Sequence, residues 1–462
     1  MQVDLEHVRT QHAVGQGAFH SASVTLTRPS GRYRFDYVYD CGALQSWWRS
    51  PAVRIAVDSY EPRYEPRVVA GAIELVGVID ALVLSHYDYD HINGAELLAA
   101  KFEVKRVYAP YLSPVELALE IARQAKSINE EYLEQLFSVA NGGDLWGIPV
   151  TRVRGGPTRD NPNLPGDPEL PRKPALDEYS PSSEGPAQPS PYPRAMEVMK
   201  AHSGGPMDAD LDHSEDARLE ASGDFIWRLR FWNHQVSDEM LFYIWSFLDA
   251  VGFPLDALTQ PNGATTVCAW LKSKTNRDAA LDAYIEAFRQ LGTSATLEIA
   301  PDHVPNLISL ALFSGPRYLG DAPDYLRYDV LPPFEGHVPH WWYGDEPDEV
   351  GWLGTGDALL GEPDVWADFS VHYAIELPRV QTVLLPHHGA APVRGPAFYN
   401  PGLNDRAGIH SVISVGTKNR YGHPREEVLT AVRKRNGYLW VITEKWALGF
   451  REFIWGWVPI AP

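Results

Sequence analysis

The chain has 462 residues, of which 44% are hydrophobic, so it can bury a large core, and we expect one large domain with insertions. Its formal charge of −20 argues against a broad basic surface for duplex nucleic acid. Two cysteines, Cys41 and Cys268, are too few for a disulfide framework or a cysteine-based zinc site. No apolar run reaches the roughly 18 residues of a membrane span. We therefore expect a soluble, cytoplasmic protein.

The first elements indicate an α/β layer. Clustered β-branched and aromatic residues predict a hairpin over 21–27 and 33–39, with its turn at 29–31. The mostly apolar run 78–85, interrupted by Asp80, predicts a strand buried on both faces, and a helix over 94–101 follows it. A short strand over 104–109 and helices over 115–126 and 130–140 come next, with Ser113 and Pro114 as a helix start.

A change of composition divides the chain. Eleven prolines between residues 157 and 193 predict a long loop or a partly disordered insertion over 155–223. Residues 224–300 form a mainly helical insertion that begins with a strand, so that 1–154 and 301–462 are the two halves of one domain. The expected elements after the first insertion are strands over 225–232, 307–313, 380–385, 411–415 and 439–443, and helices over 238–251, over 277–290 and from about Arg425.

Four possible metal ligands follow the strand over 78–85 within one short turn: His86, Asp88, Asp90 and His91. Two histidines and two aspartates at the end of a buried strand have little structural use, because each needs its own partner once it is desolvated. The alternative is a solvated acidic turn. The spacing H-x-D-x-D-H favours a metal site, in which the last Asp-His pair can face a second ion.

The second half of the chain supplies further polar groups. Asp357 follows glycines in Leu353-Gly354-Thr355-Gly356 and is a candidate bridging ligand. The strand over 380–385 runs into His387 and His388, although such a pair taken alone more often means one buried and one exposed ring. A turn that carries Lys418, Asn419, Arg420 and His423 can bind an oxyanion, or it is simply a polar helix start.

These motifs occur in a recognisable order. H-x-D-x-D-H, T-G-D, P-H-H-G and S-V-G-x-x-N-x-Y-G-H-P together resemble the metallo-β-lactamase fold, and specifically its ComEC/Rec2-like branch, which includes free-standing soluble proteins. The resemblance runs from about residue 14 to the C-terminus, outside the proline-rich insertion and the helices around 238–291. Gly15-Gln16-Gly17 resembles the G-Q-G of this branch, but Ala18 follows it in place of an acidic neighbour.

The resemblance implies a four-layered αββα sandwich with a dinuclear site where the two sheets meet. His86 and Asp88 would hold one ion and Asp90 and His91 the other, with Asp357 bridging them and His387 completing the second site. Asp88 stands where better-known members have a histidine, which favours manganese, with zinc as the alternative. The family's additional histidine has no assigned counterpart, and the candidates by position alone are His202, His213, His234 and His303.

Two divalent ions about 3.5–4 Å apart would lower the pKa of a shared water, so hydrolysis is the expected reaction class. Asp90 would also orient the nucleophile, and Asp40 would accept a hydrogen bond from a ligand histidine. His423 or His388 would bind the oxyanion or protonate the leaving group, and we favour His423 because it lies in the basic turn.

Three functions follow from these patterns. The first is a phosphodiesterase or nuclease on single-stranded DNA or a nucleotide, because of the resemblance and because eight basic and three acidic residues between 394 and 435 leave a local charge of +5. The second is a hydrolase of a carbon ester, lactone or amide, with Trp47-Trp48 and Trp341-Trp342-Tyr343 as a possible apolar lining. The third is a catalytically inactive binding module.

Overall fold

The structure is a computed structural model. It describes residues 2–29, 31–44, 51–69, 72–155, 194–195, 198–199, 211–212, 218–221, 227–234, 236–291, 308–316, 325–331, 350–390, 408–419, 421–434, 437–445 and 449–459. Most of the predicted insertion over 155–223 lies outside the described residues, as do Trp47, Trp48, Arg420 and the aromatic run over 341–343.

The first large sheet joins the two ends of the described chain. The first strand along the sequence, residues 2–11, pairs over its whole length with the last strand, residues 450–459. The predicted hairpin is confirmed, and its second strand continues the sheet in parallel with the strand that precedes the first motif. In spatial order the sheet contains β12 (Leu211–Asp212), β9 (Val150–Arg154), β8 (Val107–Pro110), β6 (Ala81–Val83), β3 (Gly31–Cys41), β2 (Phe19–Arg28), β1 (Gln2–Gln11), β21 (Phe450–Pro459) and β16 (Tyr325–Leu331), with β10 (Arg194–Ala195) beside β3.

The second large sheet is built from strands between residues 198 and 442. Four of its strands, from β17 to β20, run parallel to one another, so their carboxyl ends share one edge. In spatial order it contains β11 (Val198–Met199), β13 (Arg218–Ala221), β14 (Trp227–Asn233), β15 (Leu310–Pro316), β17 (Gly351–Gly354), β18 (Val380–Leu384), β19 (His410–Ser414) and β20 (Tyr438–Ile442).

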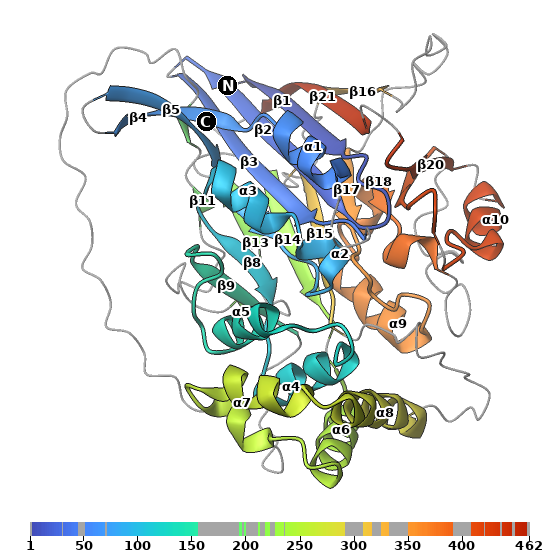
Figure 1. Ribbon diagram of the computed structural model, residues 1–462. Helices are drawn as coiled ribbons and strands as arrows, with labels where there is room; N and C mark the ends of the chain where they lie inside the picture. Colours follow the sequence, from blue (N-terminus) through green and yellow to red (C-terminus); the bar gives the residue numbers. More distant parts are fainter. Residues whose placement is uncertain are drawn as a thin grey trace.

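Helices cover the outer faces of both sheets (Figure 1). On the first sheet lie α1 (Pro51–Ser59), α3 (Ala95–Lys101), α4 (Pro114–Arg123) and α5 (Glu130–Ala140). On the second sheet lie α9 (Pro363–His372) and α10 (Glu426–Lys434). The added helices pack against α4 and α5 at the lower end of the view, and they are α6 (Asp238–Ala250), the 3₁₀ helix η1 (Leu255–Thr259), α7 (Gly263–Leu271) and α8 (Lys274–Leu291).

Alternation along the strands separates the hydrophobic cores of these layers. In β15, Leu310 and Leu312 face the core between the sheets, whereas Ala311 and Phe313 face the core under α9 and α10. Another core lies between the first sheet and its helices. Side chains with a period of two thus bury both faces of each sheet. The described residues therefore form the predicted α/β sandwich with helix, sheet, sheet and helix layers.

The prediction of one strand over 78–85 was wrong. The chain bends at Asp80, where β5 (Ala72–Ile79) ends and β6 begins in a different sheet. The Asp80 carboxylate accepts hydrogen bonds from the Arg63 guanidinium at 2.7 and 2.9 Å and from the Asp36 N–H at 2.8 Å. A buried carboxylate with these partners ties the bend in place. β5 pairs with β4 (Arg63–Val69) and β7 (Glu103–Val104) in a small third sheet, so the strand expected over 104–109 is also two strands.

The six predicted helices are confirmed, and one start is confirmed in detail. Ser113 accepts a hydrogen bond from the Glu116 N–H while the Glu116 carboxylate accepts one from the Ser113 N–H, which is a capping box before α4. The helix α7 was not predicted, since its sequence lacks strong polar alternation, and neither was α9. Among the described residues, no helix is long and apolar enough to cross a membrane.

Charged side chains are also buried between the large sheets. The Arg9 guanidinium on β1 donates to the Glu452 carboxylate on β21 at 2.6 and 2.9 Å and to the Val350 carbonyl at 2.8 Å. Both side chains are almost fully buried. Removal of either partner would leave a buried charge without its counterion, so the pair secures the junction of the chain's two ends.

We predict that the protein is less stable at pH 5 than at pH 7. Burial lowers the pKa of His7 and His12 to about 3 and that of His410 to about 4. Below the ordinary histidine value of about 6.5 the unfolded chain takes up protons that the native state does not, and each histidine then costs about 2 kcal/mol at pH 5. Asp36, whose pKa burial raises to about 6, offsets part of this loss.

Urea unfolding in EDTA at the two pH values measures this effect without a contribution from metal loss. The His410→Gln variant removes one of the three groups and should show a smaller difference between pH 7 and pH 5. Equal or greater stability of the unsubstituted protein at pH 5 would contradict the prediction.

Candidate metal centre

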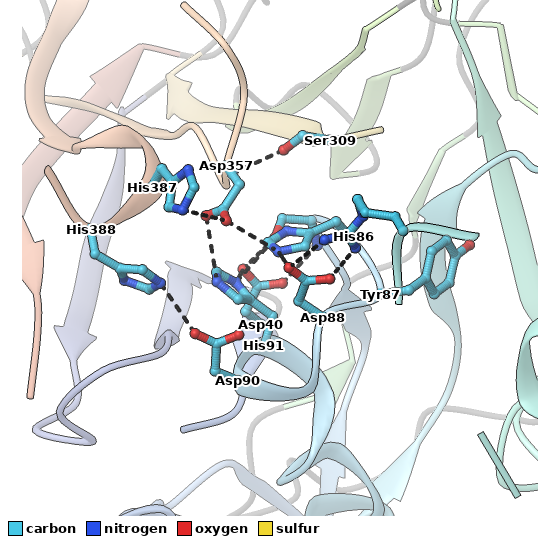
Figure 2. Close-up of polar contacts among 12 residues, drawn as sticks. Asp40, His86, Tyr87, Asp88, Asp90, His91, Ser309, Asp357, His387 and His388 are labelled. Carbon is cyan, nitrogen blue, oxygen red and sulfur yellow. Dashed lines mark hydrogen bonds and ion pairs between the residues drawn. The ribbon is translucent and has the colours of Figure 1, made fainter. Parts of the chain in front are cut away.

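Strand ends from both large sheets meet at one edge of the sandwich. In the first sheet, β3 ends beside Asp40, and β6 leads into residues 85–88 and the short helix α2 (Tyr89–Ile92). In the second sheet, β17 leads to Asp357, and β18 leads into the 3₁₀ turn η4 (Pro386–Gly389). Figure 2 shows that the side chains of these segments point toward one another.

Asp357 stands at the centre of a first group of possible ligands. Its Oδ2 lies 3.6 Å from His86 Nε2 and 3.8 Å from His387 Nε2. His86 Nε2 is in turn 3.5 Å from Asp88 Oδ2. These four residues come from three separate segments of the chain, and their donor atoms converge on one side of Asp357.

The other oxygen of Asp357 faces a second group. Its Oδ1 lies 3.6 Å from His91 Nε2, and His388 Nε2 lies 3.3 Å from Asp90 Oδ2. One ligand atom from each of Asp90, His91 and His388 lies within 4.8 Å of the others, and the same holds for His86, His91 and Asp357. The carboxylate of Asp357 thus separates two adjoining donor sets.

The chemistry of these donors fits divalent metal ions. His86 Nε2, His91 Nε2, His388 Nε2 and Asp357 Oδ1 are buried without a hydrogen-bond partner. Buried polar atoms are normally satisfied, and these all point into the same place. Donor atoms at about 2.0–2.2 Å from a shared tetrahedral ion are roughly 3.4 Å apart, close to the separations found here.

Hydrogen bonds prepare the histidines for this role. His91 Nδ1 is 2.8 Å from Asp40 Oδ2, and His388 Nδ1 is 2.9 Å from the Ser414 carbonyl. The Ser85 hydroxyl donates to Asp40 at 2.6 Å and so accepts from His86 Nδ1 at 2.8 Å. Each Nδ1 therefore carries a proton, and Nε2 is the ring nitrogen that can bind an ion.

The charge of the centre favours a cation. Burial would lower the pKa of His91, but the nearby carboxylates of Asp40 and Asp357 raise it to about 10. Burial would also raise the pKa of Asp357, yet the surrounding histidines hold it below the ordinary value. The ionised carboxylates thus favour positive charge at the point where the donor sets meet.

The backbone of η4 separates the two adjacent histidines. His387 has φ 48° and ψ 51°, and His388 has φ 53° and ψ 25°, so both lie in the left-handed region. Such conformations are costly for residues other than glycine and cluster at functional sites. Here they turn the two rings 78° apart, with their centroids separated by 6.2 Å. As a result His387 faces Asp357 and His388 faces Asp90 (Figure 2).

In the described part of the turn over 416–424, His423 lies beside the centre. Its ring centroid lies 5.7 Å from that of His387. Asn419 donates its side-chain N–H to the His423 carbonyl and therefore holds the turn together. Lys418 is exposed, and Arg420 lies outside the described residues. Of the other candidate histidines, His234 lies beside Trp232, and His202, His213 and His303 lie outside the described residues.

The segment that carries the first motif is similar to a known protein family. Residues 76–161, which include the first motif, match the sequence model of the metallo-beta-lactamase superfamily. Among solved structures, the crystal structure of unliganded yeast PDE1 is similar, with 8% sequence identity, a TM-score of 0.35, and coverage of 97% of this chain and 99% of that chain. A search of curated proteins found no match.

Sequence reasoning missed one charged group beside the first motif. Arg123 on α4 donates both terminal nitrogens to Asp88, at 3.1 Å to Oδ2 and at a shorter distance to Oδ1. It also donates to Glu120 at 2.7 Å. The signal was present in the sequence, since an acid and a base three residues apart lie among apolar residues on a predicted helix, but nothing linked that helix to Asp88.

We predict that Asp40→Asn weakens metal binding about 10- to 100-fold, the usual effect of losing a partner that orients a ligand histidine. The amide leaves His91 Nδ1 and the Ser85 hydroxyl with a weaker acceptor. Competition with a chelating dye measures the metal affinity directly. Asp58→Asn, an exposed aspartate paired with Lys101, is the control. Unchanged affinity in Asp40→Asn would refute this role of Asp40.

Proposed function

We propose that the protein is a metal-dependent hydrolase with two ion sites that share Asp357. In this proposal His86, Asp88 and His387 hold one ion, and Asp90, His91 and His388 hold the other. The assignment differs from the sequence expectation, which placed His387 in the second set and left the first set without a further histidine. The observation that carries the proposal is the group of buried, unpartnered donor atoms around Asp357.

The donor types define the reaction class. When bound, divalent ions lower the pKa of a coordinated water and offset negative charge that develops on the substrate. Imidazole and carboxylate ligands suit zinc or manganese. The superfamily match supports hydrolysis as the general chemistry. Asp90 has a second role in this proposal, since its carboxylate can accept a proton from the nucleophile and orient it.

His423 is the proposed proton donor to the leaving group. Its ring lies beside that of His387, and it belongs to a different segment from the proposed ligands. His388 is assigned to metal binding instead, because its Nδ1 is engaged by Ser414 and its Nε2 faces Asp90. A donor outside the ligand set can change its protonation without loss of an ion.

We propose a phosphodiester in single-stranded DNA or a nucleotide as the substrate. The motif order supports this choice, because it resembles the ComEC/Rec2-like branch of the superfamily. The exposed Lys418 and the neighbouring Arg420 provide positive charge next to His423 in the sequence. The net charge of −20 favours a small or single-stranded substrate over a duplex.

The test begins with metal-free protein that is reloaded with Mn²⁺ or Zn²⁺. The number of ions bound per chain is then measured. Bis-p-nitrophenyl phosphate, a single-stranded oligonucleotide and p-nitrophenyl acetate are then compared as substrates. We expect metal-dependent cleavage of the phosphodiesters, and Asp90→Asn should reduce it by at least about 100-fold because both a ligand and a proton acceptor are lost. Asp364→Asn, on the exposed surface of α9, is the matched control.

Each outcome separates the three functions. Two bound ions with cleavage of the acyl substrate alone would replace the phosphodiesterase by a hydrolase of carbon esters, lactones or amides. Less than one bound ion per chain, with no turnover of any substrate, would favour the binding module. Phosphodiester cleavage that survives in Asp90→Asn would contradict the assigned role of this residue.

We further predict that Lys418→Ala raises the KM for the oligonucleotide several-fold at low salt while kcat on bis-p-nitrophenyl phosphate changes little. A phosphate contact contributes through charge, so the effect should shrink as the ionic strength rises. His423→Gln should instead lower kcat by roughly 100-fold or more. Steady-state kinetics at two salt concentrations distinguishes the two residues, and equal effects on KM in both variants would refute the division of roles.

A further inference from the structure

Arg123 gives the two proposed donor sets different surroundings. Its guanidinium donates to both oxygens of Asp88, which is a ligand of the first set in the proposed function. A two-pronged contact between arginine and a carboxylate is among the strongest hydrogen-bonded pairs in proteins. The side chain of Arg123 is only 7% exposed, so water screens its charge weakly.

Glu120 keeps Arg123 in this position. Its carboxylate, 1% exposed, accepts from Arg123 Nε at 3.2 Å and from Nη2 at 2.7 Å, and it also accepts from the Gln124 side chain. Arg123 is therefore held between two carboxylates on the buried side of α4. The helix itself is anchored by its capping box, so the guanidinium has little freedom to leave Asp88.

The matching aspartate of the second set has no such neighbour. Asp90 Oδ2 faces His388 Nε2, and within the described part of the chain no arginine or lysine forms an ion pair with it. Asp88 and Asp90 lie two residues apart, yet among the described residues an arginine or lysine pairs only with Asp88. The difference is intrinsic to the fold, because Arg123 comes from a separate helix.

The four buried atoms of the centre that have no hydrogen-bond partner are divided unequally between the two sets. Three of the four, His91 Nε2, His388 Nε2 and Asp357 Oδ1, belong to the second set, whereas the first set contributes only His86 Nε2. His387 of the first set is also 32% exposed, against 6% for His388. The second set thus gains more from a bound cation, since more of its buried donors lack a hydrogen-bond partner.

We propose that Arg123 makes the two ion sites unequal, so that the second set binds its ion tightly and the Asp88-containing set binds its ion more weakly and exchanges it readily. This inference rests on the proposed two-ion site. A bound divalent ion at the first set must share Asp88 with a guanidinium and lie near its positive charge, which opposes binding. Arg123 acts through Asp88 and is a positioning residue rather than a catalytic one.

The test is a calorimetric titration of metal-free protein with Mn²⁺. The bound metal is then counted after dialysis. We expect two binding steps whose dissociation constants differ by at least about tenfold, which corresponds to about 1.4 kcal/mol. Asp90→Asn should weaken the tighter step, and Asp88→Asn should weaken the other. These two variants leave Arg123 in place and assign each step to its donor set.

Arg123→Gln is the decisive variant, because it removes the charge and frees the oxygens of Asp88. We expect the weaker step to tighten by at least about tenfold, whereas a purely structural role would produce a loss. Arg123→Lys retains the charge and should keep the two steps unequal. Arg152→Gln is the matched control, since Arg152 is a buried arginine that donates to the Ala140 carbonyl and stacks on Tyr111.

The outcomes separate this inference from the proposed function. Two equally tight steps in the unsubstituted protein would overturn the role of Arg123 but leave the proposed function intact. Weaker binding by an Arg123→Gln variant whose circular dichroism shows that it is folded would do the same. If Arg123→Gln does not fold, the Arg123→Lys, Asp88→Asn and Asp90→Asn titrations still decide whether the sites are unequal in the stated order. Absence of any bound Mn²⁺ or Zn²⁺ in the unsubstituted protein would refute the two-ion site itself.

Discussion

The packing of the two large sheets against each other is the constraint on which the candidate centre depends. The His86–His91 segment belongs to one sheet, and Asp357, His387 and His388 belong to the other. Hydrogen bonds set their relative position: the Tyr39 hydroxyl donates to the Leu310 carbonyl at 2.8 Å, and the Leu310 N–H donates to the Ser85 carbonyl at 2.6 Å. A shift of one sheet by a single residue would separate the donors, because neighbouring positions on a strand face opposite sides.

The sequence alone predicts the motif residues better than it predicts their grouping. Strand ends that carry His and Asp indicate the site, since the polar residues interrupt buried runs and have no other use. The sequence cannot tell which of two adjacent histidines faces which carboxylate, because that depends on the left-handed backbone of His387 and His388. In the same way, the sequence analysis treated Asp80 as an interruption within one strand. Its contacts with Arg63 and Asp36 instead make it the boundary between two sheets.

Long-range partners were the other limit of prediction. The start of α4 was predicted from Ser113 and Pro114, and its capping box lies within four residues, whereas the contact of Arg123 with Asp88 spans 35 residues. The pairing of β1 with β21 spans nearly the whole chain. Local chemistry such as caps and hairpin turns can be read from one segment, but a salt bridge between elements requires the tertiary fold that places them together.

The left-handed backbone of η4 also determines how this turn would respond to the loss of a bound ion. Two consecutive non-glycine residues in the left-handed region together store on the order of 2–6 kcal/mol, which the surrounding contacts must supply. An ion bound by either imidazole would add to those contacts, so in the proposed two-ion site the turn and the ions would stabilise one another. Loss of ions would therefore first cause local opening of this turn while the sheets beneath it remain folded. Amide hydrogen exchange at residues 387–390 would then become faster.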